Sequence, residues 1–199
     1  MPVHSLFATP FYTAPLGDAA LLAALEASCR MLAREDRAGI GWSKAKGYRG
    51  YTSYASLDDL PLRDPAFADL KRLLDREAKA FARIAHFAPG RAPRLDSLWV
   101  NVMNPGAVHS GHIHPHSIIS GTFYVTVPPG SGALRLEDPR LPMLMAAPLR
   151  SADAPPEVQP FFHAEPAAGM VFLWESWLRH EVMPNTAKTE RISISFNYR

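Results

Sequence analysis

Four of the eight histidines in the 199-residue chain fall within eight residues, at His109, His112, His114 and His116. Imidazole binds metal ions as the neutral base and is the commonest protein ligand for them. Residues at i and i+2 of a strand share a face, so His112 and His114 would converge. Pro115 favours an extended conformation at His114. The spacing predicts a metal site at a strand end, and a solvated histidine-rich loop is the alternative interpretation.

A second polar group lies near the carboxyl end of the chain. His180 begins a predicted strand, and a turn around residues 184–185 leads into another strand over residues 191–198. Alternation along that strand puts Arg191, Ser193, Ser195 and Asn197 on one face and apolar side chains on the other. Arginine binds carboxylates through paired hydrogen bonds, and a serine hydroxyl can add another. The pattern favours a cavity that binds a carboxylate, against the alternative of a half-exposed strand with a solvated arginine.

These groups need a scaffold, and the first half of the chain predicts mainly helices. We expect a strand over residues 6–12, a helix capped by Asp18 and ending near Arg34, a loop with short extended pieces over residues 39–56, and a helix from Asp64 to about His86. The residues from Trp42 to Tyr54 in that loop, together with a later insert over residues 139–168, are expected to form the substrate mouth.

Beyond residue 94 the hydrophobic period changes to that of strands, with Pro-Gly and Pro-Asn turn signals between them. The predicted strands cover residues 95–103, 120–127, 132–137, 169–174, 180–184 and 191–198, and residues 139–168 are interpreted as one long loop. Two helices followed by six or more strands predict a mainly β (α+β) jelly roll with flanking amino-terminal helices. The length predicts one domain over residues 1–199, with residues 1–94 supporting a β core over residues 95–199.

Composition excludes several classes of function. Lysine and arginine are scattered among acids and the formal net charge is only +2, so no nucleic acid partner is expected. No apolar run is long enough to span a bilayer, so no membrane partner is expected. The single cysteine, Cys29, excludes an internal disulfide and predicts a reducing, cytoplasmic location. The absence of a glycine-rich phosphate loop and of a Gly-x-Ser-x-Gly elbow argues against phosphoryl transfer and serine hydrolysis.

The two polar groups together resemble the Fe(II)/2-oxoglutarate-dependent oxygenase superfamily, through His112-x-His114, then His180, then Arg191-x-Ser193. More closely, the chain is similar to an uncharacterised bacterial family of 2-oxoglutarate/Fe(II) oxygenases. The matching motifs are His114-Pro-x-Ser, Ser120-Gly-x-x-Tyr-Val, Ser131-Gly-x-Leu, Glu137-Asp-Pro-Arg, Trp177-Leu-x-His and Arg191-Ile-Ser-Ile-Ser-Phe-Asn. The resemblance is strong over residues 96–199 and looser before them.

This resemblance implies a double-stranded β-helix that holds Fe(II) at one mouth and uses 2-oxoglutarate and O2. It implies that His112 and a second residue bind the metal with His180 as the distal ligand. It also implies that Arg191, helped by Ser193, binds the far carboxylate of 2-oxoglutarate, with Tyr124 and Asn104 as further candidates. The implied reaction converts 2-oxoglutarate to succinate and CO2 and hydroxylates a small molecule or a side chain that the sequence does not identify.

One position departs from the superfamily pattern. The common metal triad is two histidines and one carboxylate, but the second position here is His114. The site could use three histidines, or two histidines and water with His114 outside the first shell, or a distant carboxylate such as Asp138. We favour His112, His114 and His180 as the metal ligands. The neighbouring His109 and His116 are expected to flank the site or to be exposed to solvent.

Two other kinds of protein remain as alternatives. A cupin-type metalloprotein is suggested by Gly106, five further residues and then His112-x-His114, but residues 115–119 lack the expected acid. A zinc ion on three histidines could support hydrolysis. A non-catalytic β-sandwich that binds a small carboxylate is the other alternative, and retention of both histidine groups argues against it. The oligomeric state stays open, with a homodimer among the options.

Overall fold

The computed structural model describes residues 2, 4, 6–88, 90, 92–140 and 142–199, and in it two antiparallel sheets face each other. The larger sheet has the order β1 (Phe11–Pro15), β8 (Met170–Glu175), β5 (Ile119–Thr126), β10 (Arg191–Tyr198), β3 (Leu95–Met103), β2 (Gly50–Thr52). The smaller sheet has the order β4 (His109–His112), β9 (His180–Val182), β6 (Leu134–Glu137), β7 (Phe161–Ala164). This arrangement confirms the predicted mainly β jelly roll.

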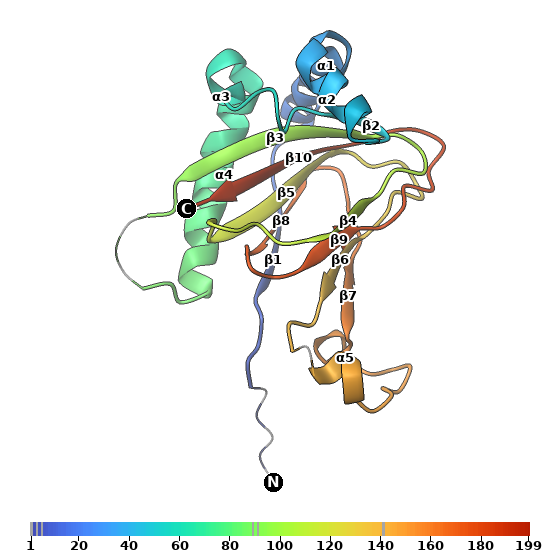
Figure 1. Cartoon of the computed structure of the whole chain (residues 1–199). Coiled ribbons are helices and arrows are strands. Elements are labelled where there is room, and N and C mark those ends of the chain that lie inside the picture. The colour runs from blue at the N-terminus through green and yellow to red at the C-terminus, as the bar shows by residue number, and fades with distance from the viewer. Residues whose placement is uncertain (1, 3, 5, 89, 91, 141) are drawn as a thin grey trace.

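Helices cover the outer face of the larger sheet, and the smaller sheet lies on its other side (Figure 1). The helical segments are α1 (Ala19–Glu35), α2 (Arg37–Ala45), α3 (Leu60–Arg63), α4 (Pro65–Ile84), α5 (Pro142–Ala146) and the 3-10 turn η1 (Pro156–Val158). The Asp18 carboxylate accepts a hydrogen bond from the Leu21 N–H at 2.9 Å, and that of Asp64 accepts one from the Ala66 N–H at 2.8 Å. Both predicted caps are therefore confirmed, because each satisfies an amide that the helix itself leaves free.

The two faces of β10 serve different parts of the molecule. Ile192, Ile194 and Phe196 are fully buried in the core between the larger sheet and the helices. Arg191, Ser193 and the next alternate residues face the smaller sheet, as strand alternation predicts. Strands β3 and β5 follow the same rule, so three adjacent strands present polar and aromatic side chains to the space between the sheets.

Residues 37–45 form helix α2, where the sequence predicted loop. The Asp36 carboxylate accepts a hydrogen bond from the Gly39 N–H at 3.0 Å and caps this helix. A Cβ at Gly39 would lie only 2.3 Å from Asp36 Oδ2, so the close packing requires glycine. Glycine has low helix propensity, and it therefore concealed the helix in the sequence. The short extended piece predicted in the same segment is present as β2, and the short helix α3 was not predicted.

The first strand also begins later than expected, at Phe11 rather than residue 6. Leu6 and Phe7 are 68% and 86% exposed, whereas Phe11 pairs with Trp174 of β8. The apolar run of residues 6–12 therefore extends beyond the edge of its partner strand. Apolar character alone did not show where the pairing starts.

The segment over residues 139–168 contains β7, α5 and η1, so the prediction of one long loop was wrong. β7 pairs with β6, with Phe162 opposite Leu136. Its short apolar stretch stands among prolines and alanines, and only pairing with a distant strand makes it a strand. Leu141, which the predicted loop included, lies outside the described residues.

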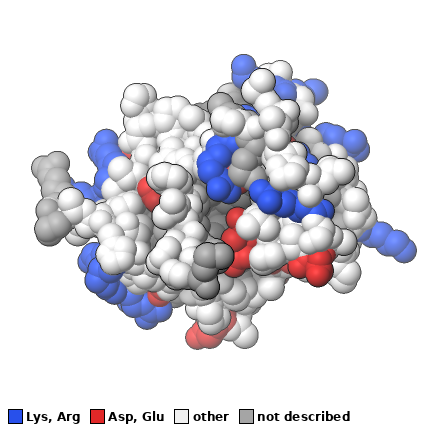
Figure 2. Space-filling model, turned by 90° about the horizontal axis from the view of Figure 1, so that it is seen from below, with Lys and Arg blue, Asp and Glu red and all other residues white. Residues whose placement is uncertain are grey.

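Ion pairs between neighbouring strands line the smaller sheet. Arg135 pairs with Glu181 across β6 and β9, and Arg179 Nε lies 2.9 Å from Glu137 Oε2. Figure 2 shows basic and acidic side chains interspersed around a central hollow on one face of the molecule. Within the described ranges, no helix has both the length and the apolar character that crossing a bilayer requires.

Candidate active site

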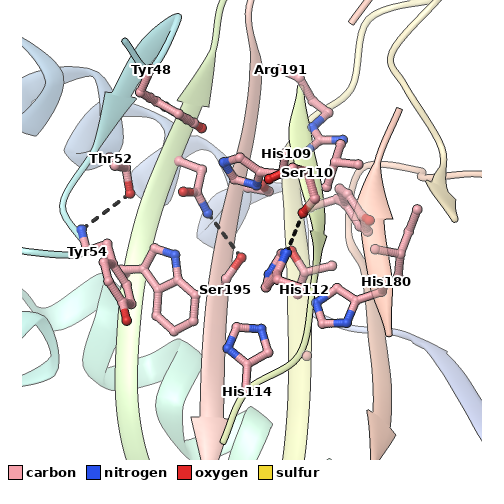
Figure 3. A pocket seen from close by; sticks show the side chains of 18 of the residues that line it. Tyr48, Thr52, Tyr54, His109, Ser110, His112, His114, His180, Arg191 and Ser195 are labelled. Carbon is pink, nitrogen blue, oxygen red and sulfur yellow. Dashed lines mark hydrogen bonds between the residues drawn. The ribbon is translucent and has the colours of Figure 1, made fainter. Parts of the chain in front are cut away.

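Three histidines from separate segments meet between the sheets. His112 ends β4 and His180 begins β9, and the two are direct partners in the ladder. His114 follows two residues after His112, and its N–H donates to the Ser176 carbonyl at 3.1 Å. One ring nitrogen from each histidine lies within 4.8 Å of the other two, and Figure 3 shows the three rings facing one another. The predicted convergence is present, although His114 lies just beyond the strand.

Backbone carbonyls fix the protonation of two of these rings. His112 Nδ1 lies 2.7 Å from the Ser110 carbonyl, and His180 Nδ1 lies 2.9 Å from the Leu178 carbonyl. A carbonyl only accepts, so each Nδ1 carries the proton and each Nε2 keeps its lone pair. This is the second-shell arrangement that commonly orients metal-binding histidines. The donor set therefore fits a divalent transition metal such as Fe(II).

Burial keeps two of the three rings neutral at pH 7. Together with a smaller contribution from the neighbouring His112, it lowers the pKa of His180 to about 3 and the pKa of His114 to about 4. A neutral imidazole has a free lone pair, so the site needs no proton release from these rings before a metal binds.

The depressed pKa of His180 predicts that the metal-free protein is less stable in mild acid. Between its ordinary value of 6.5 and about 3, the ring takes up a proton more readily in the unfolded chain than in the folded one. Stability should fall as the pH drops from 7 to 5, with His180 alone accounting for about 2 kcal/mol. Urea unfolding at the two pH values measures this. His180→Gln should reduce the pH dependence by that amount, and an equal dependence in both proteins would contradict the assignment.

Arg191 lies at another end of the same space, 2% exposed. Its Nη1 donates to the Gly132 carbonyl at 3.0 Å and its Nη2 lies 3.0 Å from Met103 Sδ, while its Nε has no partner in the part of the chain that the structure describes. Among the described residues no carboxylate pairs with it. Burial lowers the pKa of the guanidinium, yet arginine stays charged in proteins. A buried charge without a counter-charge is costly, and a bound anion would compensate it.

Two more predicted residues accompany Arg191. The guanidinium carbon lies 5.6 Å from the centre of the Tyr124 ring, and burial raises the pKa of Tyr124 to about 12. Ser193 follows on the same face of β10. Both residues line the same cavity as Arg191, and their part in cosubstrate binding stays a prediction.

The three histidines and Arg191 line one cavity of about 300 Å³ between the sheets. Its walls come from β3, β5, β8 and β10 on one side and from β4, β6 and β9 on the other, and α2 and β2 also contribute lining residues. The lining residues are Trp42, Tyr48, Thr52, Tyr54, Trp99, Asn101, His109, Ser110, His112, His114, Gly121, Thr122, Tyr124, Leu134, Trp174, His180, Val182, Arg191, Ser193 and Ser195.

Sequence reasoning missed two residues near Arg191. Tyr48, just after α2, lies against His109 with ring centres 5.1 Å apart and ring planes tilted by 32°, and its buried hydroxyl has no hydrogen-bond partner among the residues that the structure describes. His109 was expected to flank the site or be exposed, but it lines the cavity. It and His112 are three apart and would face opposite sides of a regular strand. A register shift between them in β4 turns both inward.

Three other residues named from the sequence are not brought into the cavity. Asn104 is exposed in the turn after β3, and alternation would in any case not direct it inward, because Trp99 and Asn101 are the residues of β3 that face the cavity. The Asp138 carboxylate is held by Arg140 Nε at 2.9 Å and Nη2 at 2.6 Å, and it is not among the clustered metal-ligand candidates of the described residues. His116 is exposed at a positive φ of 71°, as expected.

Comparison with known proteins gives one family match. The family model described as "Putative 2OG-Fe(II) oxygenase" matches residues 97–197, which is half of the chain and includes all three histidines and Arg191. A search of curated protein sequences found no match.

Solved structures share the fold at low sequence identity. A prolyl-4-hydroxylase from Pseudomonas putida is 21% identical, with 96% of this chain and 92% of that chain covered and a TM-score of 0.63. The alpha-ketoglutarate-dependent epimerase SnoN from nogalamycin biosynthesis is 16% identical, with 96% and 78% covered and a TM-score of 0.66. HygX from Streptomyces hygroscopicus, solved with nickel and 2-oxoglutarate, is 15% identical, with 96% and 82% covered and a TM-score of 0.59. These similarities show the double-stranded β-helix fold.

Proposed function

Because this chain belongs to the 2OG-Fe(II) oxygenase family, we propose that its cavity couples the decarboxylation of 2-oxoglutarate to the hydroxylation of a second substrate. The family uses Fe(II), 2-oxoglutarate and O2, and neither the cupin nor the non-catalytic alternative predicts this match. We further propose that the enzyme works in the cytoplasm, where its only cysteine, the buried Cys29, would stay reduced.

One observation carries the assignment of the site. A single cavity holds three histidines, each with a ring nitrogen within 4.8 Å of the other two, and a buried guanidinium without a carboxylate partner among the described residues. The imidazoles suit a transition metal. The guanidinium suits the far carboxylate of a dicarboxylate whose other end reaches that metal. A zinc hydrolase would give no reason for the unpaired Arg191.

Each residue then has a stated task. His112, His114 and His180 would hold Fe(II), which when bound supplies the oxidative chemistry that splits 2-oxoglutarate with O2. The carbonyls behind His112 and His180 accept from Nδ1 and so leave both Nε2 lone pairs free for the metal. Arg191 would hold the far carboxylate and so fix the orientation of the cosubstrate. The surrounding β-sheet walls exclude water from the reacting groups.

The proposal is tested by titrating the Fe(II)-loaded protein with 2-oxoglutarate in the absence of O2. Chelation of the metal by the 2-oxo acid should produce a weak visible charge-transfer band that saturates at equimolar cosubstrate. Iron bound without the band would contradict the oxygenase assignment and favour a hydrolase, and a protein that binds no iron would contradict both.

Tyr48 is expected to assist Arg191. Its orphaned hydroxyl is close enough to Arg191 for the guanidinium charge to act on its pKa, which burial raises. A donated hydrogen bond to the bound carboxylate would satisfy this hydroxyl. Tyr48→Phe should therefore weaken 2-oxoglutarate binding about tenfold or more.

Calorimetric titration of the metal-loaded protein measures this change. The matched control is Tyr54→Phe, which removes a hydroxyl from the opposite end of the cavity and should leave the affinity unchanged. 2-Oxovalerate, which lacks the far carboxylate, should bind the wild-type protein and Tyr48→Phe alike. Equal 2-oxoglutarate affinities for the wild-type protein and Tyr48→Phe would show that this hydroxyl takes no part.

A further inference from the structure

The end of the cavity away from Arg191 has an aromatic wall. Trp42 of α2 lies 6.2 Å from Tyr54, and Tyr54 lies 5.2 Å from Trp99 of β3, measured between ring centres. The wall continues to the metal candidates, because Trp99 lies 6.0 Å from His114. In Figure 3, Arg191 lies at the upper right of the view and Tyr54 at the left, with His114 below both. The aromatic wall therefore approaches the histidines from a different side than the guanidinium.

Exposure decreases along this wall toward the metal candidates. Tyr54 is 59% exposed, while Trp99 is only 8% exposed. The Tyr54 and Trp99 rings meet edge to face at 74°, so both still present ring surface to a ligand. A flat apolar group could pass Tyr54 and pack beside Trp99, next to His114. Contacts of this type between rings stabilise a complex beyond the burial of area alone.

A polar group with an unused acceptor lies beside the aromatic wall. Asn101 of β3 lines the cavity and is 2% exposed, and its Nδ2 donates to Ser195 Oγ at 3.0 Å. Its Oδ1 is buried and accepts no hydrogen bond from the described residues. Buried amide oxygens are nearly always paired in native proteins. A ligand that donates an N–H or O–H hydrogen bond to Asn101 Oδ1 would therefore satisfy this acceptor.

The charges of the cavity-lining residues limit the class of ligand that can bind at the aromatic end. None of the residues that line the cavity is acidic, so a cationic ligand would find no counter-charge and would approach the metal unfavourably. The buried cation of the cavity, Arg191, lies at the cosubstrate end. An uncharged ligand is the class that the aromatic end fits.

We propose that the aromatic end binds the primary substrate through an uncharged, planar ring that carries an N–H. The ring packs against Trp99 and Tyr54, and the N–H donates to Asn101 Oδ1. This places the edge of the ring beside His114, which the proposed function assigns to the metal, and the inference rests on that function for the reaction that follows. A site with a buried acceptor discriminates strongly against an analogue that lacks the donor.

Indole and benzofuran test this inference, because they have nearly the same shape and differ in the N–H. Each is titrated calorimetrically into the protein as isolated and again, without O2, after loading with Fe(II) and 2-oxoglutarate. Indole should bind about tenfold more tightly than benzofuran in both states. Asn101→Leu should remove this preference, and Tyr54→Ala should weaken both probes alike. Asn104→Leu makes the same replacement outside the cavity and should change neither affinity.

Three results would overturn the inference: no binding of indole, equal affinity for the two probes, or a preference that persists in Asn101→Leu. Loss of indole binding on loading would also overturn it, because the probe would then occupy the cosubstrate end. The comparison of two probes on the unaltered protein does not depend on the folding of any variant. Failure of the proposed function would give a different result, because the 2-oxoglutarate titration of the Fe(II)-loaded protein would then produce no charge-transfer band.

Discussion

Replacing Arg191 with methionine is expected to weaken 2-oxoglutarate binding by about 30-fold or more, because removing one partner of a buried charge pair costs about 2 to 5 kcal/mol. Methionine fills much of the arginine volume, so the change removes the charge with little cavity formation. The metal should stay bound, since Arg191 is not among the three clustered histidines. Calorimetric titration with 2-oxoglutarate and metal analysis of the same sample measure the two effects.

Thermal unfolding adds a second readout for this variant. In the ligand-free protein Arg191 is a buried charge without a carboxylate partner among the described residues, so its removal should leave the unfolding temperature unchanged or raise it. Arg179→Met is the matched control, because this arginine is 52% exposed and pairs with Glu137 outside the cavity. Unchanged 2-oxoglutarate affinity in Arg191→Met would reject its role as the carboxylate-binding residue.

The second large effect concerns the metal. His114→Ala is expected to lower Fe(II) affinity by more than about 100-fold, as His112→Ala and His180→Ala are, because losing a ligand should exceed the roughly 10- to 100-fold effect of losing a residue that only orients a ligand. This result would distinguish a site of three histidines from one of two histidines and water. Metal content after dialysis, and direct titration with Fe(II) without O2, give the affinities.

Two control variants complete that experiment. His116→Ala alters an exposed histidine, and Asp138→Asn alters the carboxylate that pairs with Arg140. Both should bind the metal like the wild-type protein. Full metal affinity in His114→Ala, or its loss in Asp138→Asn, would reject the proposed ligand set.

Part of this site could be predicted because a strand with one face toward the cavity and one toward the core has a regular alternation of polar and apolar residues in its sequence. The strand predicted over residues 191–198 has the bounds of β10, and Arg191 and Ser193 line the cavity as predicted. The two faces of this strand meet very different surroundings, so their residue types differ sharply. The spacing of His112 and His114 was informative for the same reason.

The missed features depend on contacts between distant segments. Tyr48 lies near Arg191 only because folding brings the turn after α2 to the cavity, and the glycines of α2 concealed that helix. His109 turns inward only because of a register shift in β4, which no local pattern shows. The strand β7 depends on pairing with β6. The helix or strand propensity of a short segment does not indicate its contacts with distant segments.

The two faces of β10 have different surroundings, and this difference has a consequence for protein engineering. Residues 193 and 195 face the cavity, whereas Ile192 and Ile194 are fully buried against the helices. A library that varies only positions 193 and 195 should therefore alter ligand selectivity while most of its members still fold. A library of equal size at positions 192 and 194 should contain few folded members, because overpacking or cavities in a core destabilise it. Selection for new substrates could thus begin on one face of a single strand.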